Sequence, residues 1–420
     1  MAKMMKRSYN VAAILLTSLI LSVLIVTACG PKTPAEPQST GPITINIGVC
    51  AAMSGPAASY GQLGQESVDT FLQVFNRQGF KVGNQTYNFK VITADDQANS
   101  EGGSAAAKKL VYEDGCKFIV GHWTPNFKAV QAVTNPAKVI LFSHTGADAV
   151  PGPGGYDPKT MPYVAFPIAA HEVVVAYIFG IAEANPNYKK IGIIDTVLNK
   201  GIGWDDADKQ MDEKGIRYFH QFTQPNIANY APFITKCAEE GCDFIFTPDV
   251  AAALAIVKQR WEMGYKDIRI CCAGPITSPA TWIQRAGYDA VQGLIVSWGA
   301  VWEARNRPLN ADQIAMLQET MGLLADKHNG SFTYTGWIPW TPTQLFILSQ
   351  AMQKAKTVDD TDALMKVIRG GTFDLPTGQY AFTGTETYGS PVVMTTGIIE
   401  SQIQGDKEVY YSQYHLPPLP

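Results

Sequence analysis

The chain has 420 residues, of which 46% are hydrophobic and 17% are charged, and its formal net charge is −4. This composition is typical of a globular protein with two or three domains of about 150 residues each. The small negative charge and the lack of a basic run beyond the N-terminus argue against a nucleic-acid partner, because neutralising phosphates requires clustered lysine and arginine.

Residues 1–28 have the pattern of an export signal. Basic residues come first, an apolar run covers residues 11–26, and small residues precede Cys29. The run is too short for a membrane-spanning helix, and no later segment reaches the ~18 apolar residues that a span requires. The segment resembles a bacterial lipoprotein signal, which implies lipid attachment at Cys29; a chance apolar N-terminus is the alternative. We therefore expect an exported protein, lipid-anchored to the outer face of the cytoplasmic membrane or in the periplasm.

Residues 29–41 are expected to form a flexible tether. They contain three prolines and no apolar periodicity. An extended chain of this composition, at ~3.1 Å per residue, holds the body some tens of ångströms from the lipid.

The next part of the chain alternates between strand and helix patterns. Strands are expected at 43–49, 87–92, 118–120 and 139–142, and helices at 68–75, 105–112 and 125–137. Alternation of this kind indicates a parallel sheet that helices cover on both faces.

The same alternation restarts near residue 167. The expected helices are 172–184, 204–213, 230–239 and 250–263, and the expected strands are 190–194, 218–222, 244–246, 268–271 and 294–296. Further helices at 311–328, 340–354 and 359–368 and β-rich residues to 414 are too few for an independent third domain. We expect them to complete the first two domains.

Ligands of open parallel sheets bind beyond the carboxyl ends of the strands. The loops at those ends are 51–64, 121–126, 143–148, 195–203, 247–249 and 273–279. In the second of them, Thr124 suits the N-cap and Pro125 the first helical position, so free N–H groups would favour an anion such as a carboxylate. A capped helix start that binds nothing explains the same residues.

The stretch 50–61, CAAMSGPAASYG, resembles the opening loop of the leucine/isoleucine/valine-binding protein family. Asp95-Asp96, Gly121-His122, Ser143 and the glycines at 201 and 203 follow in the same order as in that family. The resemblance implies the type I periplasmic binding fold: α/β, with two doubly wound parallel-sheet lobes joined by a three-crossing hinge. Lobe one would be 42–166 plus 299–370 and lobe two 167–298 plus 371–412, with crossings at 166–167, 297–299 and 370–372.

The resemblance also implies a ligand site. Tyr60 stands where the family packs an aromatic ring on the ligand, and 124–126 and 145–147 stand where the ligand carboxylate is held. Lys200 replaces a usual tyrosine, and Gly274 replaces the glutamate that takes the amino group. The expected ligand-binding residues are Ser54, Tyr60, Trp123, Thr124, Asn126, His144, Thr145, Ala147, Lys200, Asp249 and Gly274.

The change at Gly274 leaves two interpretations open. Asp249 could supply the missing negative charge for an ammonium group, although capping the helix from residue 250 is its alternative role. Otherwise the ligand is an acid without an amino group, and Lys200 or His144 adds positive charge, unless Lys200 is simply solvated.

Motifs for catalysis are absent from the sequence: no Gly-x-Ser-x-Gly surrounds Ser54, and there is no Walker loop or His-Glu-x-x-His. We expect a monomeric solute-binding lipoprotein of an ABC importer, which captures an amino acid or related organic acid or amide and delivers it to a permease. No cofactor or metal is expected, because no Cys or His pair has zinc spacing. A surface lipoprotein hydrolase and a ligand-sensing receptor subunit are the alternatives.

Six cysteines remain besides Cys29. Cys237 and Cys242 could meet across a helix-to-strand turn and form a disulfide, since the protein is exported, or they could stay reduced. The other four lie in or beside apolar runs and are expected to be buried thiols.

Overall fold

The computed structural model describes residues 41–55, 58–122, 126–143, 155–167, 170–197, 204–224, 227–248, 250–273, 279–297, 310–329, 337–395 and 397–415. The chain divides into two units, Met1–Pro42 and Ile43–Pro420. The signal, Cys29 and the tether up to residue 40 lie outside the described residues. None of the described helices has the length and apolarity needed to cross a bilayer.

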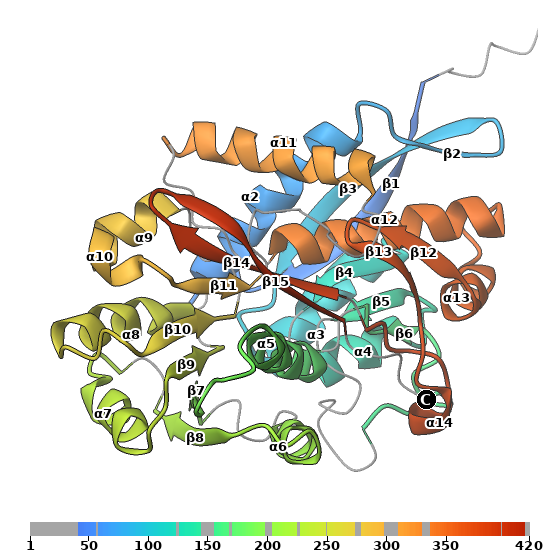
Figure 1. Ribbon diagram of the computed structural model, residues 1–420. Coiled ribbons are helices and arrows are strands. Elements are labelled where there is room, and N and C mark those ends of the chain that lie inside the picture. Colours follow the sequence, from blue (N-terminus) through green and yellow to red (C-terminus); the bar gives the residue numbers. More distant parts are fainter. Residues whose placement is uncertain are drawn as a thin grey trace, which may run out of the picture. The chain divides into compact units, whose positions relative to one another are not determined.

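The first sheet has six strands in the order β2-β3-β1-β4-β5-β6 (Figure 1). Their bounds are β1 Ile43–Ala51, β2 Phe80–Val82, β3 Gln85–Asp95, β4 Phe118–His122, β5 Ile140–Ser143 and β6 Val164–Ala165. All pairs are parallel except the edge hairpin of β2 and β3. The chain builds outward from β1 in one direction and then in the other, which is the doubly wound arrangement.

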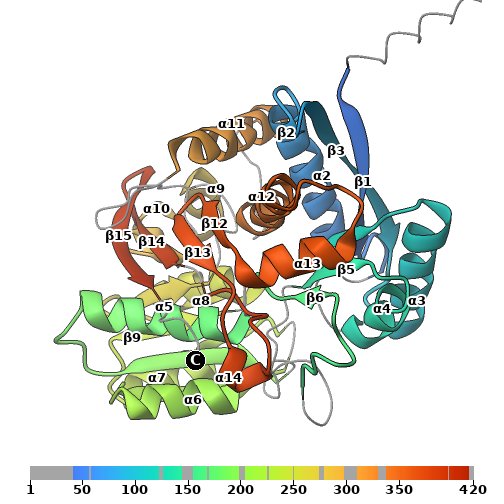
Figure 2. The ribbon, with the colours of Figure 1, turned by 90° about the vertical axis from the view of Figure 1, so that its right-hand side faces the viewer.

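Helices cover both faces of this sheet because its strands are apolar on both faces. Ile47 and Val49 of β1 lie in one core cluster, and Cys50 lies in the other. The first cluster contains residues of α2 Ala58–Phe75, α11 Ala311–Lys327, α12 Trp337–Ala355 and α13 Thr361–Gly370. The second contains residues of α3 Ser100–Lys108, the π-helical turn η2 Lys109–Glu113 and α4 Phe127–Thr134. Figure 2 shows α2 beside α11 and α12, far along the chain.

The second sheet has seven strands in the order β15-β14-β11-β10-β9-β7-β8. Their bounds are β7 Ile191–Thr196, β8 Tyr218–Thr223, β9 Phe244–Thr247, β10 Arg269–Cys272, β11 Ile295–Ser297, β14 Gly397–Gln404 and β15 Lys407–His415. Strands β7 to β11 are parallel, and β14 and β15 add an antiparallel edge (Figure 1).

The second sheet is also covered on both faces. One core cluster contains residues of α5 Ala170–Ala184 and α6 Trp204–Glu213. The other contains residues of α7 Ala231–Glu239, α8 Val250–Glu262, α9 Pro279–Ala286 and α10 Tyr288–Val291. The adjacent residues Cys271 and Cys272 of β10 belong to different clusters, as the alternation of a strand requires.

The segment between α13 and β14 returns to the first sheet. It contains the hairpin of β12 Thr372–Leu375 and β13 Gly378–Ala381 and the short helix α14 Thr385–Tyr388. Phe373 of the hairpin is fully buried in the core around α2 and α12. The backbone of Phe166 donates to Val392 O and accepts from Met394 N, so the end of the first sheet and the segment before β14 lie side by side.

Most expected elements are confirmed within a few residues of their bounds. The elements that the pattern did not predict are short: β2, β6, the β12–β13 hairpin, α9, α10 and α14. The two-sheet α/β architecture was predicted because its long helices and buried strands carry the strongest periodicity.

Candidate functional site

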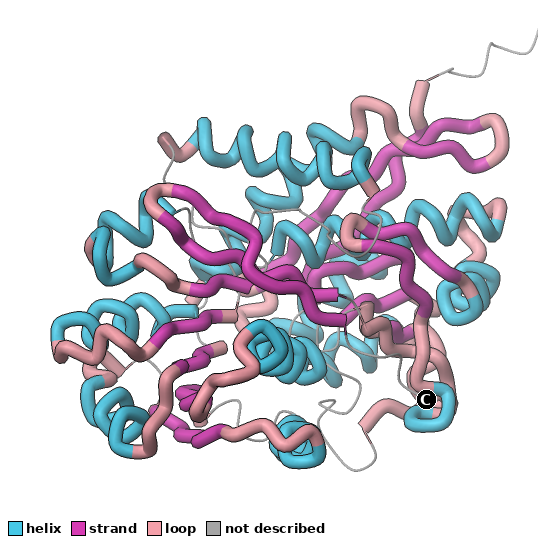
Figure 3. Tube along the Cα trace, viewed as in Figure 1, coloured by secondary structure: helices cyan, strands magenta, loops and turns pink. Residues whose placement is uncertain are grey.

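The carboxyl ends of four parallel strands form the frame of the candidate site. Strands β1, β3, β4 and β5 are parallel and end at Ala51, Asp95, His122 and Ser143, so these four residues lie at the same end of the first sheet. Figure 3 shows the strands of the molecule with helices on their faces. Of the expected ligand residues, Ser54 and Asn126 are described, and the backbone of Tyr60 lies in the first turn of α2. The others lie outside the described residues: Trp123, Thr124, His144, Thr145, Ala147, Lys200, Asp249 and Gly274.

Asp95 holds the loop that follows β1. Its Oδ1 accepts the backbone N–H of Met53 at 2.9 Å and of Gln97 at 3.0 Å, and its carboxylate also binds the hydroxyl and N–H of Ser54. Burial tends to raise the pKa of Asp95, but these hydrogen bonds outweigh it and the pKa lies below its usual range. The carboxylate is therefore charged at neutral pH. The hydrogen bond between the Ser54 hydroxyl and Asp95 helps to fix the shape of the loop after β1.

Gly61 lets α2 approach the same loop. A methyl group at Gly61 would lie 2.0 Å from the carbonyl oxygen of Ala52. No side chain fits at that distance, so glycine is required by close approach of the backbone. The loop after β1 is consequently held from two sides, by Asp95 and by α2.

Asn126 stands at the start of α4, next to the expected anion-binding turn. It is 1% exposed and occupies the N-cap position of α4, which begins at Phe127. The prediction of Thr124 at the N-cap and of a helix from Pro125 was therefore wrong by two residues. The backbone carbonyl of Asn126 accepts the N–H groups of Ala129 and Val130, at 3.0 and 3.1 Å. Its side chain packs on α3, where a methyl group at Gly103 would lie 2.8 Å from it.

Gln344 of α12 fixes the end of β4. Its Oε1 accepts the backbone N–H of Gly121 at 2.7 Å, and the side chain is fully buried. Gly121 has φ +67, a left-handed conformation that favours glycine, and the pairing of β4 with β5 becomes irregular between Ile119 and His122. One buried amide therefore sets the direction in which the chain enters the turn before α4.

In the second sheet, a buried carboxylate holds the end of β7 to the start of α6. Asp195 is 1% exposed, and its Oδ2 accepts the indole N–H of Trp204 at 2.6 Å. Trp204 also packs edge-on against His220, whose pKa burial lowers to about 4. His220 is thus neutral at physiological pH. Trp204 belongs to the core of the second sheet.

Two further features of the described residues bear on function. Within the part of the chain that the structure describes, no group of three or more His, Cys, Asp and Glu side chains could hold a metal ion.

A cavity of about 540 Å³ lies beside Tyr87 and Val358. Tyr87 pairs with Ile43 at the start of β1. The cavity therefore lies near the amino-terminal end of β1, away from the carboxyl ends of the strands that frame the candidate site.

A family model described as periplasmic binding protein matches residues 44–393. The chain belongs to the periplasmic binding protein family. Membership of this family of solute-binding proteins confirms the prediction of a binder rather than an enzyme. It also implies that this periplasmic binding protein works outside the cytoplasm.

Known proteins resemble this periplasmic binding protein over nearly its whole length. Leu/Ile/Val-binding protein homolog 3 of Brucella melitensis is 22% identical over 83% of this chain and 89% of its own. A solute binding protein of an ABC transporter from Rhodopseudomonas palustris, in complex with p-hydroxybenzoic acid, has a TM-score of 0.68 and 19% identity, covering 90% and 98% of the two chains. LivJ from Streptococcus pneumoniae, in complex with isoleucine, has a TM-score of 0.63 and 17% identity, covering 89% and 100%. The structural matches confirm the predicted type I fold.

The sequence did not reveal three residues that shape the site of this periplasmic binding protein. Gln344 acts on Gly121 from 223 positions away, and Gly61 and Gly103 matter through close backbone approach. Asp95 was noted within a motif, but its role in holding the loop after β1 emerged from the structure.

Proposed function

We propose that this protein is the extracytoplasmic receptor of an ABC importer, which captures a small carboxylate-bearing solute between two lobes and delivers it to a permease. The lipid on Cys29 anchors it to the membrane, and the chain acts as a monomer. The observation that carries this proposal is the hydrogen-bonded frame at the carboxyl edge of the first sheet, where Asp95 and Gln344 hold the loops after β1 and β4. Preformed loops of this kind are typical of small-molecule sites.

The start of α4 supports a carboxylate ligand. The first turn of α4 contains no acidic residue. The dipole of a helix favours negative charge at its N-terminus. If the carboxylate of the ligand is held here, the rest of the ligand extends toward lobe two.

Two classes of solute fit this arrangement. One structural relative is in complex with isoleucine and another with p-hydroxybenzoic acid. The family's glutamate for the amino group is replaced by the uncharged Gly274. We therefore favour an aromatic or aliphatic acid without an amino group.

The packing of the described residues suggests a change in the lobe boundaries. Lobe two was expected to resume at residue 371, but Phe373 and Tyr380 lie in the core of the first sheet, and β14 pairs with β11 of the second. We place the third crossing between Thr395 and Gly397 instead. Residues 392–394, just before this proposed crossing, pair with Phe166.

A thermal-shift screen tests the proposed ligand class. We expect 4-hydroxybenzoate to raise the melting temperature and isoleucine to leave it unchanged. A ligand at 100 times its Kd adds about 2.7 kcal/mol to the free energy of unfolding, which is easily measured. The matched control is 4-hydroxybenzyl alcohol, which lacks the carboxylate. Stabilisation by isoleucine alone would reverse the ligand assignment, and chemical change of a bound compound would instead support the hydrolase alternative.

Two substitutions test the proposed site. We expect Tyr60→Ala, which removes ring contact with the ligand, and Ala147→Phe, which fills the carboxylate side, each to weaken binding at least tenfold, about 1.4 kcal/mol. Circular dichroism should show an unchanged fold. Calorimetric titration of both variants with the ligand found in the screen gives the affinities, and unchanged values in both would refute the site.

A further inference from the structure

Helix α7 ends in a turn that brings two cysteines together. The N–H of Cys242 donates to the carbonyl of Cys237 at 2.9 Å, and the N–H of Gly241 donates to the carbonyl of Ala238 at 3.0 Å. Gly241 has φ +76. These two bonds and the left-handed glycine define a Schellman motif, in which the side chains at the positions of Cys237 and Cys242 normally make a hydrophobic contact. Here both members of that contact are thiols.

The two sulfurs meet over a glycine of the neighbouring strand. A methyl group at Gly192 of β7 would lie 2.4 Å from Cys237 Sγ and 3.4 Å from Cys242 Sγ. The absence of a side chain at Gly192 therefore makes room for both sulfurs, and the two thiols share a hydrogen bond. Both residues are buried, at 0% and 5% exposure, and both are free thiols in this structure.

The surrounding contacts hold this turn in place. The carboxylate of Asp243 accepts the N–H groups of Lys189 and Lys190, and the Lys190 ammonium lies 3.1 Å from Glu240. Gln221 of β8 donates to Cys237 Sγ at 3.2 Å. These contacts hold the backbone around the pair and keep both sulfurs beside Gly192.

We infer that Cys237 and Cys242 form a disulfide bond in the exported protein. The oxidant is a disulfide of the thiol-oxidising class found outside the cytoplasm. One thiolate attacks a sulfur of that disulfide and gives a mixed disulfide; the second thiolate then attacks it, forms the Cys237–Cys242 bond and releases the oxidant as two thiols. Two protons and two electrons leave the pair and are taken up by the oxidant.

Burial of the two sulfurs determines when the bond can form. Because both sulfurs are covered in the folded chain, the bond forms during folding or when the end of α7 opens, and it is then protected from thiols in solution.

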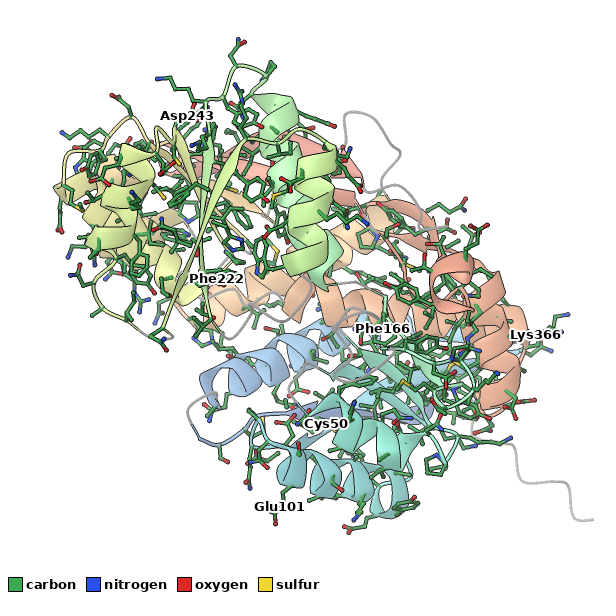
Figure 4. All side chains as sticks on the ribbon, turned by 90° about the horizontal axis from the view of Figure 1, so that it is seen from below. Cys50, Glu101, Phe166, Phe222, Asp243 and Lys366 are labelled. Atoms are coloured by element: carbon green, nitrogen blue, oxygen red, sulfur yellow. The ribbon has the colours of Figure 1, made fainter. Side chains whose placement is uncertain are left out.

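The pair lies near the amino-terminal ends of the parallel strands of the second sheet, away from the proposed solute site. Asp243, which follows Cys242, precedes β9, whereas Phe222 lies near the carboxyl end of β8; Figure 4 shows the two residues at opposite ends of these strands. The inferred bond ties the end of α7 to the start of β9. It should therefore stabilise lobe two and leave solute binding unchanged.

Peptide mapping tests the inference. The full chain is expressed with its export signal and purified from the cell envelope; a second sample is unfolded, reduced and refolded with glutathione disulfide. Both are unfolded, alkylated without reductant and digested with trypsin. Cys237 and Cys242 share the peptide 237–258, and we expect it to be unalkylated and lighter by two hydrogen atoms. The peptide 270–285 is the matched control, because Cys271 and Cys272 face opposite sides of β10 and should both be alkylated.

Stability gives an independent measurement. Closing a short loop typically raises the melting temperature of a domain of this size by roughly 4 °C. We expect the oxidised wild type to melt higher by this amount than both the reduced wild type and Cys242→Ala, with equal affinity for solute. Two alkyl groups on 237–258 in both preparations would overturn the inference. This result leaves the proposed transport function unaffected, since that function does not depend on the bond.

Discussion

Replacing Gly61 by alanine should destabilise the protein by about 2 kcal/mol and weaken solute binding about tenfold. The added methyl group would lie 2.0 Å from Ala52 O and 2.6 Å from Ala52 C. These are backbone atoms, so α2 or the loop after β1 must shift, and such overpacking typically costs about 3 kcal/mol. The better helix propensity of alanine returns about 1 kcal/mol. The displaced loop is part of the proposed solute site, so the affinity should fall with it.

A matched control is available in another helix. Gly322 of α11 is exposed, and a methyl group there would meet nothing within 4 Å. Gly322→Ala should therefore stabilise the protein by about 0.5–1 kcal/mol and leave the affinity unchanged. Urea denaturation and calorimetric titration of both variants provide the measurements. If Gly61→Ala is as stable as the wild type and binds equally well, the loop after β1 is not held by α2.

The fold was predictable because its main elements have strong patterns. Helices such as α2 show apolar residues at i, i+3 and i+4, and the buried parallel strands are short apolar runs between them. The alternation of the two kinds of element indicates the doubly wound sheets without reference to any relative. The three-crossing arrangement came from the family resemblance.

The elements that were missed have weak local patterns. The hairpin of β12 and β13 has four residues in each strand, and its Phe373 and Leu375 become meaningful only through packing against the first core. The proposed position of the third crossing depends on this packing. A sequence pattern contains no information on which of two cores a short strand joins.

The loops of the candidate site could be named from the sequence, but the contacts that hold these loops could not. Parallel strands place their carboxyl ends together, so the loops after β1 and β4 could be named from the order of elements. The residues that hold those loops act across long separations: Asp95 is 42 positions from Met53, and Gln344 is 223 positions from Gly121. Neither distance leaves a local signal.

Replacing Gln344 by leucine should lower the free energy of unfolding by about 2 kcal/mol and weaken solute binding about tenfold. Leucine has a similar size, but it leaves the buried N–H of Gly121 without its 2.7 Å acceptor, and an unsatisfied buried donor costs about 1–3 kcal/mol. Gly121 is held at φ +67 and directly precedes His122 and the turn before α4. Release of this constraint lets the turn move, so the proposed carboxylate site loses its preorganised N–H groups.

The matched control is Gln350→Leu in the same helix. Gln350 also accepts a backbone N–H, that of Asp374 at 2.9 Å, but it lies in a partly exposed position beside β12. Its replacement should cost about 1 kcal/mol of stability and leave solute affinity unchanged, because the hairpin is away from the strand ends. Equal loss of affinity in both variants would show that general loosening of α12, and not the bond to Gly121, controls binding. A tenfold loss confined to Gln344→Leu would show that a buried amide of lobe one presets the carboxylate site before the solute arrives.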